Sequence, residues 1–486
     1  MNPTLVFRAD GSSNIGYGHI HRLISLAFML HSNFNCLFVS DDAPDFLTTA
    51  LQQLAISFIQ VPNNQYPFPN ERKTQASIAF DMEDILTGNE IVVLDGYWFG
   101  KAYQQAIKAK GCTLVYIDDL IEQGNIADVV INHAPGLSNT AYTDTALSTC
   151  MYTGTKFCLS PVPTTFLHQS KAGFKKQLLI AMGGADPLNF TQHIIEQEKD
   201  LLNAFEKVVV LIGNGYLHET TLSAAIASIP TIELKKNLSK NAVYELMQTA
   251  DTAILSASTM AVEYAQIGGL LAILQTAENQ QNIYQGLLSS SAAITIEGLK
   301  NSNAETYQQC TEAQQQMFDG KTSERFNKLF TELTIQSIVQ IEKATAAHTN
   351  ITYQWATNSI VRAHSFSTHT ISLAEHEQWF SKKIADPQCL YFIGKWNDTY
   401  IGSIRFDFEG DTACISYLVD PALHGKGMGR ILLAKGLAFL STQIAIHTVV
   451  GYVMPQNLAS VKVFERFNFN CTTEANKLKF TKKNYR

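Results

Sequence analysis

The chain has 486 residues, of which 46% are hydrophobic, and its formal net charge is −7. At roughly 150 residues per domain, this length predicts about three domains, each with a packed core. No stretch approaches the roughly 18 apolar residues of a membrane span, and residues 1–10 lack the basic start and apolar run of a signal peptide, so no membrane insertion is expected.

The charge is unevenly distributed along the chain. Residues 351–486 hold 15 Lys+Arg and 10 Asp+Glu, a balance of +5, which leaves 21 basic against 33 acidic residues, or −12, for the rest. The acidic majority argues against nucleic-acid binding, whereas the basic C-terminal part suits a polyanionic ligand. The eight cysteines are scattered without a CxxC pair, which predicts reduced thiols, a cytoplasmic location and no zinc site.

The first two thirds of the chain alternate short apolar runs with helical patterns. Strands are predicted at 4–9, 36–40, 91–95, 113–118 and 129–132, with helices at 21–30, 44–53, 74–86 and 101–109. A second set of strands is predicted at 177–182, 207–212, 231–234, 252–255, 272–274 and 293–296. This rhythm predicts an α/β fold with two doubly wound, Rossmann-type lobes at 1–160 and 161–345, which meet near Pro161 and Pro163.

A third domain is expected at 351–486. A helical pattern from 323 to about 345 ends the second lobe, and the polar residues 346–350 are expected to be a linker. Strands are predicted at 401–408, 413–419 and 447–454, with a helix at 431–440. The third domain is therefore expected to be mixed α/β.

The first candidate site is the segment RADGSSNIGYGHIHR at residues 8–22, between the first strand and the first helix. Ligands of open α/β sheets bind at this end of the strands. Gly16 and Gly18 allow close approach of the backbone, and His19 and Arg22 stand at the helix start. A neutral imidazole accepts a proton from water. By itself the pattern is equally compatible with a structural histidine.

The second candidate site is VDPALHGKGMGR at residues 419–430, a glycine-rich turn between a strand and a helix. Unpaired amides at the helix start suit a pyrophosphate. The segment resembles the pyrophosphate loop of the GNAT N-acetyltransferases, and residues 457–469 resemble the NxxSxxxYxxxGF ending of that family. The resemblance covers about residues 352–480 and implies acetyl-CoA as co-substrate, bound by Leu418, Val419, His424, Gly425, Lys426, Gly427, Met428, Gly429, Arg430, Asn457 and Ser460.

Two departures from the acetyltransferase pattern concern the chemistry. Phe464 stands where the family often has the tyrosine that protonates the departing thiolate, and phenylalanine donates no proton. Tyr417, Tyr452 or water are the substitutes, and Asp407 and Glu375 are the candidates for the base. A domain without acetyltransferase activity stays open as an alternative.

The first 300 residues resemble the UDP-sugar hydrolases of pseudaminic acid biosynthesis, which are related to a GT-B glycosyltransferase. The resemblance is carried by residues 8–22 and by LDGYWFG (94–100), YIDDLI (116–121), AMGGADP (181–187), LSASTMAVEYA (255–265) and ENQQN (278–282). It implies a GT-B-like pair of lobes, cleavage of a UDP-sugar by water without a metal, His19 as the base and Asn279 as a substrate contact. We further expect Gly183 and Gly184 at the pyrophosphate, Ser256, Ser258 and Glu263 at uridine and ribose, and Asp95 and Tyr97 at the sugar, although Gly96 replaces the histidine usual before that tyrosine.

The two resemblances imply consecutive steps. The acetyltransferase domain resembles the enzyme that acetylates UDP-4-amino-4,6-dideoxy-N-acetyl-β-L-altrosamine, and the product of that step is the UDP-2,4-diacetamido-2,4,6-trideoxy-β-L-altropyranose that the hydrolase cleaves. The partners expected are UDP-activated amino sugars. Two alternatives remain, a UDP-sugar glycosyltransferase and a hydrolase or nucleotide-sugar-binding protein with an inactive acetyltransferase domain. The sequence predicts no oligomeric state.

Overall fold

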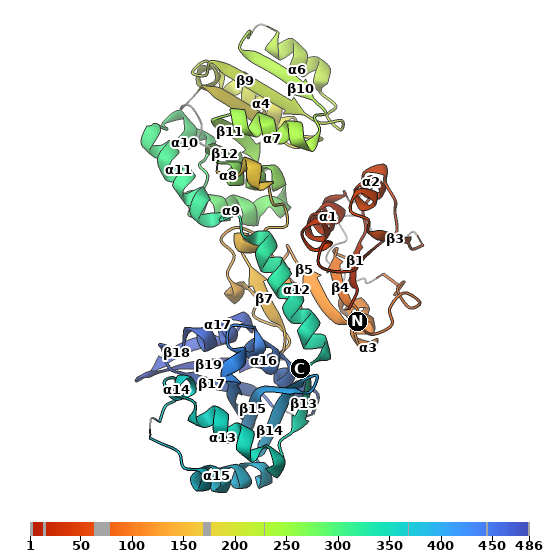
Figure 1. Ribbon diagram of the computed structural model, residues 1–486. Helices are drawn as coiled ribbons and strands as arrows, with labels where there is room; N and C mark the ends of the chain where they lie inside the picture. The colour runs from red at the N-terminus through yellow and green to blue at the C-terminus, as the bar shows by residue number, and fades with distance from the viewer. Residues whose placement is uncertain are drawn as a thin grey trace. The chain divides into compact units, whose positions relative to one another are not determined.

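The computed structural model describes residues 3–12, 16–62, 78–168, 176–227, 229–367, 369–443 and 446–484. They form three β-sheets with helices around them (Figure 1). The chain divides into two compact units, one of Met1–Ile131, Asn139–Tyr152 and Phe326–Arg486, the other of Asn132–Ser138 and Thr153–Arg325. No helix among the described residues combines the length and the apolar character that crossing a membrane requires.

The first sheet has the order β3-β2-β1-β4-β5-β6-β7. Its strands are β1 Leu5–Ala9, β2 Cys36–Ser40, β3 Ser57–Gln60, β4 Ile91–Asp95, β5 Thr113–Ile117, β6 Val129–Asn132 and β7 Cys150–Thr153, and its helices are α1 Gly18–Leu30, α2 Asp45–Gln53 and α3 Lys101–Ala109. From β3 to β6 neighbouring strands are parallel, and every residue of β1 and β4 is buried, as expected of strands covered on both faces. The predicted parallel sheet is confirmed.

The second sheet is also parallel, with the order β10-β9-β8-β11-β12. Its strands are β8 Gln177–Ala181, β9 Lys207–Ile212, β10 Ile232–Lys236, β11 Thr252–Ser256 and β12 Leu270–Leu274. Its helices are α4 Phe190–Gln197, α5 Lys199–Leu202, α6 Glu219–Ile226, α7 Lys240–Thr249, α8 Thr259–Ile267, α9 Gln281–Ser289, α10 Ile296–Lys300 and α11 Ala304–Met317. Alternate residues enter two separate cores, such as Leu179 on one face and Leu178 on the other, because side chains of a strand alternate.

The third sheet has the order β13-β14-β15-β16-β17-β19-β18. Its strands are β13 Gln340–Lys343, β14 Cys389–Trp396, β15 Thr399–Glu409, β16 Thr412–Val419, β17 Thr448–Val453, β18 Asn470–Glu474 and β19 Lys477–Lys483. Its helices are α13 Thr349–Thr357, α14 Ser359–Arg362, α15 Leu373–Ala385, α16 Met428–Gln443 and α17 Leu458–Arg466. Only the β16–β17 pair is parallel among the strand pairs described, and the others are antiparallel.

Three sequence predictions were wrong. The described part of the predicted helix 74–86, from residue 78 on, contains turns and no helix. The predicted strand 293–296 is a single bridge between Ala272 and Ile294, because α10 begins at Ile296. The helix expected to reach residue 345 is α12 Thr322–Ile338, and β13 follows it, so the third sheet begins before the expected linker.

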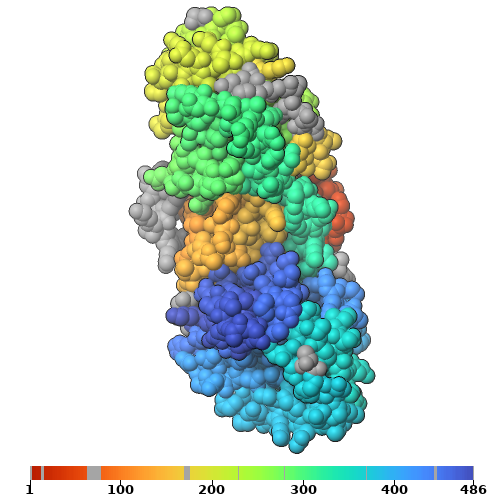
Figure 2. All heavy atoms as spheres, turned by 90° about the vertical axis from the view of Figure 1, so that its left-hand side faces the viewer, coloured from red at the N-terminus to blue at the C-terminus, as the bar shows by residue number. Residues whose placement is uncertain are grey.

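Helix α12 from Phe326 on belongs to the same compact unit as the first and third sheets. The Asn327 side chain donates to the carbonyl of Met29, 2.8 Å away, and the rings of Phe330 and Phe34 lie 6.3 Å apart. Residues 139–152 also contact the C-terminal strands, and the orange and dark-blue atoms meet there in Figure 2. The third sheet is therefore packed on the first lobe through two segments.

Candidate active sites

The first candidate site lies where β1 and β4, which pair side by side, reach their carboxyl ends. His19 is in the first turn of α1 and Asp95 is the last residue of β4. The Nδ1 atom of His19 lies 2.7 Å from Oδ1 of Asp95, and Asp95 is fully buried. The strand order thus joins two residues from motifs that lie far apart in the chain.

Arg22 holds the same carboxylate from a second direction. Its Nε and Nη2 atoms donate to the two oxygens of Asp95 at 2.9 and 2.7 Å, and its Nη1 donates to Asp119 at 2.7 Å. The Tyr97 hydroxyl donates to the same Asp119 oxygen at 3.1 Å, and the Tyr97 ring packs edge-on against His19 at 4.6 Å. Asp119 follows β5 in the YIDDLI motif, and its carboxylate was not predicted as a site residue.

Two charged groups approach Nδ1 of His19. The Asp95 carboxylate and Nη2 of Arg22 each lie 2.7 Å from it. Burial alone would raise the pKa of Asp95, but Arg22 and His19 outweigh it and hold that pKa below its ordinary value. An ionised carboxylate only accepts hydrogen bonds, so a neutral His19 that donates to Asp95 carries its proton on Nδ1. The lone pair is then on Nε2, which is the arrangement that a general base requires.

Asp95, which was expected at the sugar, has protein partners for both of its oxygens. They are engaged by His19 and Arg22. A β-carbon at position 96 would lie 2.7 Å from the Phe99 ring, which explains why glycine replaces a larger residue there. Of the predicted loop residues, Gly16 donates to Ser12 at 2.8 Å and Gly18 opens α1, while 13–15 lie outside the described residues.

The second sheet places its predicted residues at carboxyl ends of adjacent strands. Gly183 and Gly184 follow β8, with open space beside both α-carbons. Ser256 ends β11 and its hydroxyl lies 3.1 Å from that of Ser258, which precedes α8. Because β8 and β11 pair, the glycine and serine loops lie at one edge of the sheet.

Glu263, which was expected at uridine and ribose, is buried. Tyr244 donates to it at 3.2 Å and Lys240 lies 3.4 Å away. Burial, partly offset by Lys240 and Tyr244, raises the pKa of the Glu263 carboxyl. Asn279 is in a short 3₁₀ helix, Glu278–Gln280, and its side chain lies outside the described residues.

The third sheet has a cavity of about 430 Å³ beside the glycine-rich loop. Eight predicted residues line it, namely Leu418, Val419, His424, Gly425, Gly427, Gly429, Asn457 and Ser460. Asn457 caps α17 by accepting from the Ser460 amide at 3.2 Å. The loop from β16 and the start of α17 therefore meet at one cavity, as the sequence predicted for a cofactor.

Gly425 and Gly427 have positive φ angles of 77° and 81°, which turn the loop into the start of α16. Within the described residues, the amides of Gly427, Met428 and Gly429 donate to no main-chain carbonyl. Such free amides at a helix start are donors for phosphate oxygens. The loop has the geometry of an anion site.

Three predicted loop residues do not line the cavity with their side chains. Met428 is buried in a core with Val339 and Ile431. Arg430 is 5% exposed and turns to α12, where Nε donates to Glu332 at 2.9 Å and Nη1 to Gln336 at 2.8 Å. Lys426 is exposed and is absent from the lining. The side chains of Met428 and Arg430 are engaged away from the cavity, so any ligand contact of these two residues runs through the backbone.

Tyr417 and Phe464 lie beside each other. Phe464 is 2% exposed and packs on Phe480 and Phe469, so its ring belongs to the core. Tyr417 lines the cavity and donates to Ser460 at 2.9 Å. Burial, only partly offset by Ser460, raises the pKa of Tyr417 to about 12, which keeps its hydroxyl protonated.

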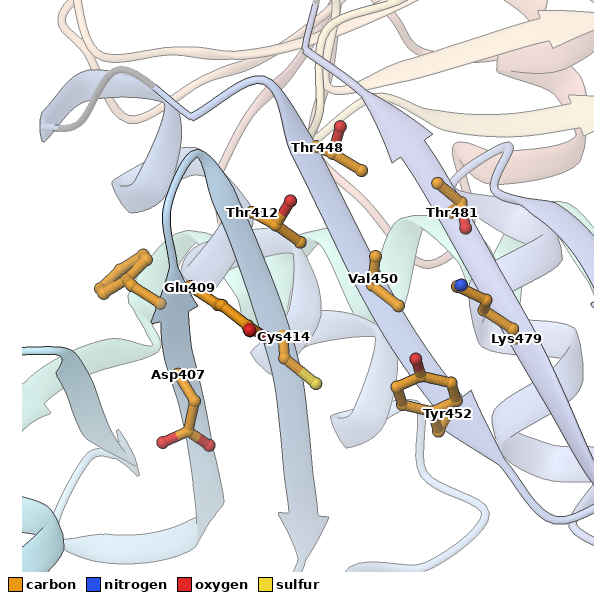
Figure 3. A pocket seen from close by; sticks show the side chains of 10 residues that line it. Asp407, Glu409, Thr412, Cys414, Thr448, Val450, Tyr452, Lys479 and Thr481 are labelled. Carbon is orange, nitrogen blue, oxygen red and sulfur yellow. The ribbon is translucent and has the colours of Figure 1, made fainter.

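A second concavity, of about 630 Å³, opens on the other face of the sheet. Figure 3 shows its side chains, among them Asp407, Glu409, Cys414, Tyr452 and Lys479 from β15, β16, β17 and β19. Helices α16 and α17 cover the opposite face, since Gly436 abuts Phe406 and Gly451 abuts Phe464. Tyr452 therefore lies on the face away from the loop cavity, and Tyr417 lies within that cavity.

The strands β16 and β17 separate between the two concavities. Their pairing ends at Ile415 and Gly451, while β16 continues to Val419. Tyr417, Leu418 and Val419, which pair with β15 and lie beyond the described pairing with β17, line the loop cavity.

The two candidate bases have structural partners. Lys383 and Arg405 contact Asp407 at 2.7 and 2.8 Å, and although burial opposes them they lower its pKa. Glu375 accepts from the amide and hydroxyl of Ser372 in a capping box of α15, and these bonds lower its pKa. Both carboxyls are poor proton acceptors in this state. Among the described residues, no group of three or more His, Cys, Asp or Glu side chains is arranged to hold a metal ion.

Residues 339–470 match the acetyltransferase (GNAT) domain family. An uncharacterized protein of Methanocaldococcus jannaschii is 22% identical over 95% of this chain and 96% of its own. The mycothiol acetyltransferase of Salinispora tropica is 45% identical over 51 residues, 10% of this chain and 17% of that protein. The match of the domain model agrees with the position of the loop cavity.

Among solved structures, spermidine N-acetyltransferase from Vibrio cholerae in complex with CoA and spermine is 16% identical to this chain. The match covers 30% of this chain and 96% of that protein, with a TM-score of 0.29. A domain from Methanocaldococcus jannaschii is 19% identical, covers 30% of this chain and 97% of its own, and has a TM-score of 0.27.

Proposed function

From the GNAT acetyltransferase domain at residues 339–470 we infer a two-step enzyme, in which this domain acetylates a UDP-amino sugar and the first two lobes hydrolyse the product. The substrates we propose are UDP-4-amino-4,6-dideoxy-N-acetyl-β-L-altrosamine and then UDP-2,4-diacetamido-2,4,6-trideoxy-β-L-altropyranose. The support is the order of six motifs in the first 300 residues together with the geometry of His19. The sugar itself is taken from the resemblance of these motifs.

In the first step the 4-amino nitrogen attacks the thioester carbon of acetyl-CoA. The C–N bond forms, the C–S bond breaks, and the proton lost by the amine balances the one gained by the thiol. Tyr417 lines the loop cavity and stays protonated, so it is the residue we assign to donate a hydrogen bond to the departing sulfur. The position of Phe464 in the core leaves that role open to Tyr417.

The amino sugar is proposed to approach from the face that carries Asp407, Glu409 and Tyr452. The thioester reaches this face where β16 and β17 cease to pair, after Ile415. Cofactor and acceptor then occupy opposite faces and meet at the gap between the two strands. Carboxylates and hydroxyls on this face suit an amino sugar with several polar groups.

In the second step water attacks C1 of the acetylated sugar. Nε2 of His19 takes a proton from the water, the C1–O bond to UDP breaks, and UDP leaves with the bonding electrons. Asp95 stabilises the imidazolium that forms, and Arg22 holds Asp95 in place. The loops with Gly183, Gly184, Ser256, Ser258 and Glu263, together with Asn279, are proposed to bind UDP.

The observation that carries the hydrolytic step is the contact between His19 Nδ1 and buried Asp95 at 2.7 Å. A histidine that only packs in a core needs no ionised carboxylate, whereas a base needs its tautomer fixed. The test supplies UDP-2,4-diacetamido-2,4,6-trideoxy-β-L-altropyranose and measures release of UDP and free sugar. His19→Ala is expected to slow release by about 10²- to 10⁴-fold, the usual contribution of a general base.

The matched control is His21→Ala on the same helix. His21 is exposed and stacks on Phe46 at 4.5 Å, so its loss is expected to leave hydrolysis unchanged. Equal rates for wild type and His19→Ala would exclude His19 as the base. Release of UDP only when a sugar acceptor is added, with label moving onto that acceptor, would identify a glycosyltransferase instead.

A further inference from the structure

The cofactor cavity has one wall that lies outside the matched acetyltransferase segment. Helix α12, Thr322–Ile338, ends before residue 339, yet Lys328 and Glu332 line the cavity beside the loop. These residues are four apart and so lie on one face of the helix. Ile335, on the same side, packs against the core of Met428 and Ile431. Helix α12 is therefore anchored on the loop that binds the cofactor.

Glu332 is in direct contact with the loop. A β-carbon at Gly427 would lie 2.5 Å from the carboxyl carbon of Glu332, so the end of the Glu332 side chain lies against the loop at this glycine. A free carboxylate here would repel a pyrophosphate. Its charge is balanced by Arg430, whose Nε lies 2.9 Å away in a pair that is almost fully buried. The Glu332–Arg430 pair thus fixes the loop to α12 and contributes no net charge.

Because Arg430 balances the charge of Glu332, Lys328 contributes a net positive charge to the residues that line the cavity. Its side chain is exposed and forms no ion pair with the carboxylates that the structure describes. It stands one helical turn before Glu332, at the cavity that holds the free amides of the loop. Lys328 lines the same cavity as Gly427 and Gly429. Charge-assisted hydrogen bonds between an ammonium group and phosphate are the strong class.

We propose that α12 is part of the acetyl-CoA site and that Lys328 binds a phosphate group of coenzyme A. The proposal uses only the cofactor of the acetyltransferase domain and does not depend on the sugar or on the hydrolytic step. It makes cofactor affinity depend on a helix that the acetyltransferase domain does not itself contain. Acetyl-CoA binding would accordingly require the connection between the second lobe and the third sheet to be folded.

The test is titration of the full-length protein with coenzyme A by calorimetry. Lys328→Ala is expected to raise Kd about tenfold, Lys328→Glu to raise it further, and Lys328→Arg to stay close to wild type because the charge is kept. Lys321→Ala is the matched control, since this lysine precedes α12 and lies outside the cavity lining. Equal Kd values for Lys328→Ala, Lys321→Ala and wild type would overturn the proposal.

Dephospho-CoA distinguishes the phosphate groups. If the effect of Lys328→Ala persists with dephospho-CoA, the lysine contacts the pyrophosphate, and if it vanishes, the lysine contacts the 3′-phosphate. The thermal unfolding midpoint of each variant serves as the check of folding. A loss of affinity in Lys328→Ala that Lys328→Arg does not restore would also contradict the proposed charge contact.

Discussion

The carboxylate of Asp95 determines how His19 acts. It accepts from Nδ1 of His19 and from two nitrogens of Arg22, and it has no contact with solvent. Burial of an ion is tolerated when its lone pairs are satisfied, as they are here. The position of the His19 ring is therefore set by contacts with Asp95 and Arg22.

Replacement of Asp95 by Asn tests this orientation. The amide of asparagine donates to Nδ1, so the His19 proton moves to Nε2 and the lone pair no longer faces the substrate. We expect UDP-sugar hydrolysis to fall by about 10²- to 10⁴-fold, in the range seen when a catalytic histidine is locked in the wrong tautomer. Rates of UDP release from the diacetamido sugar measure the effect.

The same Asp95→Asn protein supplies its own control. Its acetyl transfer rate is expected to stay near that of wild type, because Asp95 and the loop cavity share no residue. Its thermal midpoint is expected to fall, because Arg22 loses an ionised partner in a buried site. Hydrolysis at the wild-type rate would show that Asp95 does not set the tautomer. A parallel loss of both activities would point to a folding defect.

At the residue scale the sequence predicted His19 and Arg22 at the end of β1, because a glycine-rich turn before a helix marks a ligand loop. It did not predict their partners. Asp95 lies 76 positions from His19, and only the pairing of β1 with β4 joins them. Asp119 was within a quoted motif, but its bond to Arg22 depends on the same strand order. The spacing of motifs along the chain does not indicate which strands pair, and so does not indicate which residues meet.

At the scale of elements, strand β19 is fixed to the first lobe by a buried lysine. Lys482 Nζ donates to the carbonyls of Ala146 and Phe467, each at 2.8 Å, and to Leu147 at 3.3 Å. Arg466 adds a contact over the Tyr152 ring at 4.1 Å. Residues 139–152 thus connect the first lobe to the end of the third sheet.

Stability of this connection is expected to depend on pH. Burial lowers the pKa of Lys482 to about 7, whereas an unfolded lysine has a pKa of about 10.4. Between pH 7 and 10.4 Lys482 is protonated in the unfolded chain and largely neutral in the folded one. The free energy of unfolding therefore rises with pH in this range, by at most about 1.4 kcal/mol per pH unit. Wild type should gain stability relative to Lys482→Met between pH 7 and 9.

Thermal unfolding midpoints of the two proteins across that range measure the effect. Lys483→Met is the matched control, because Lys483 is the next residue and is exposed. It should follow the wild-type pH dependence. A difference between wild type and Lys482→Met that is the same at pH 7 and pH 9 would contradict the prediction.

Strand bounds were predicted best where an uninterrupted apolar run marks the strand. The buried strands β2, β4 and β9 were predicted with their observed bounds, because uninterrupted apolar runs mark strands covered on both faces. The edge strand β3 has mainly exposed residues and gives no such signal. The end of α12 was missed because Ile335, Ile338 and Ile341 recur every three residues, a spacing compatible with a helix, into β13.

At the scale of the whole molecule, the chain holds a GNAT acetyltransferase domain and two parallel α/β sheets with polar residues at their strand ends. The proposed acetylation and hydrolysis are consecutive reactions, because the product of the first is the substrate of the second. A tether raises effective concentration only where the geometry lets the intermediate pass between sites.

The most direct measurement is a mass-spectrometric time course of the purified protein with acetyl-CoA and UDP-4-amino-4,6-dideoxy-N-acetyl-β-L-altrosamine. The account predicts a gain of one acetyl group by the UDP-sugar, followed by release of UDP and free diacetamido sugar, with the acetylated UDP-sugar accumulating in His19→Ala. Release of UDP without prior acetylation, or acetylation that is never followed by UDP release in the wild type, would contradict it.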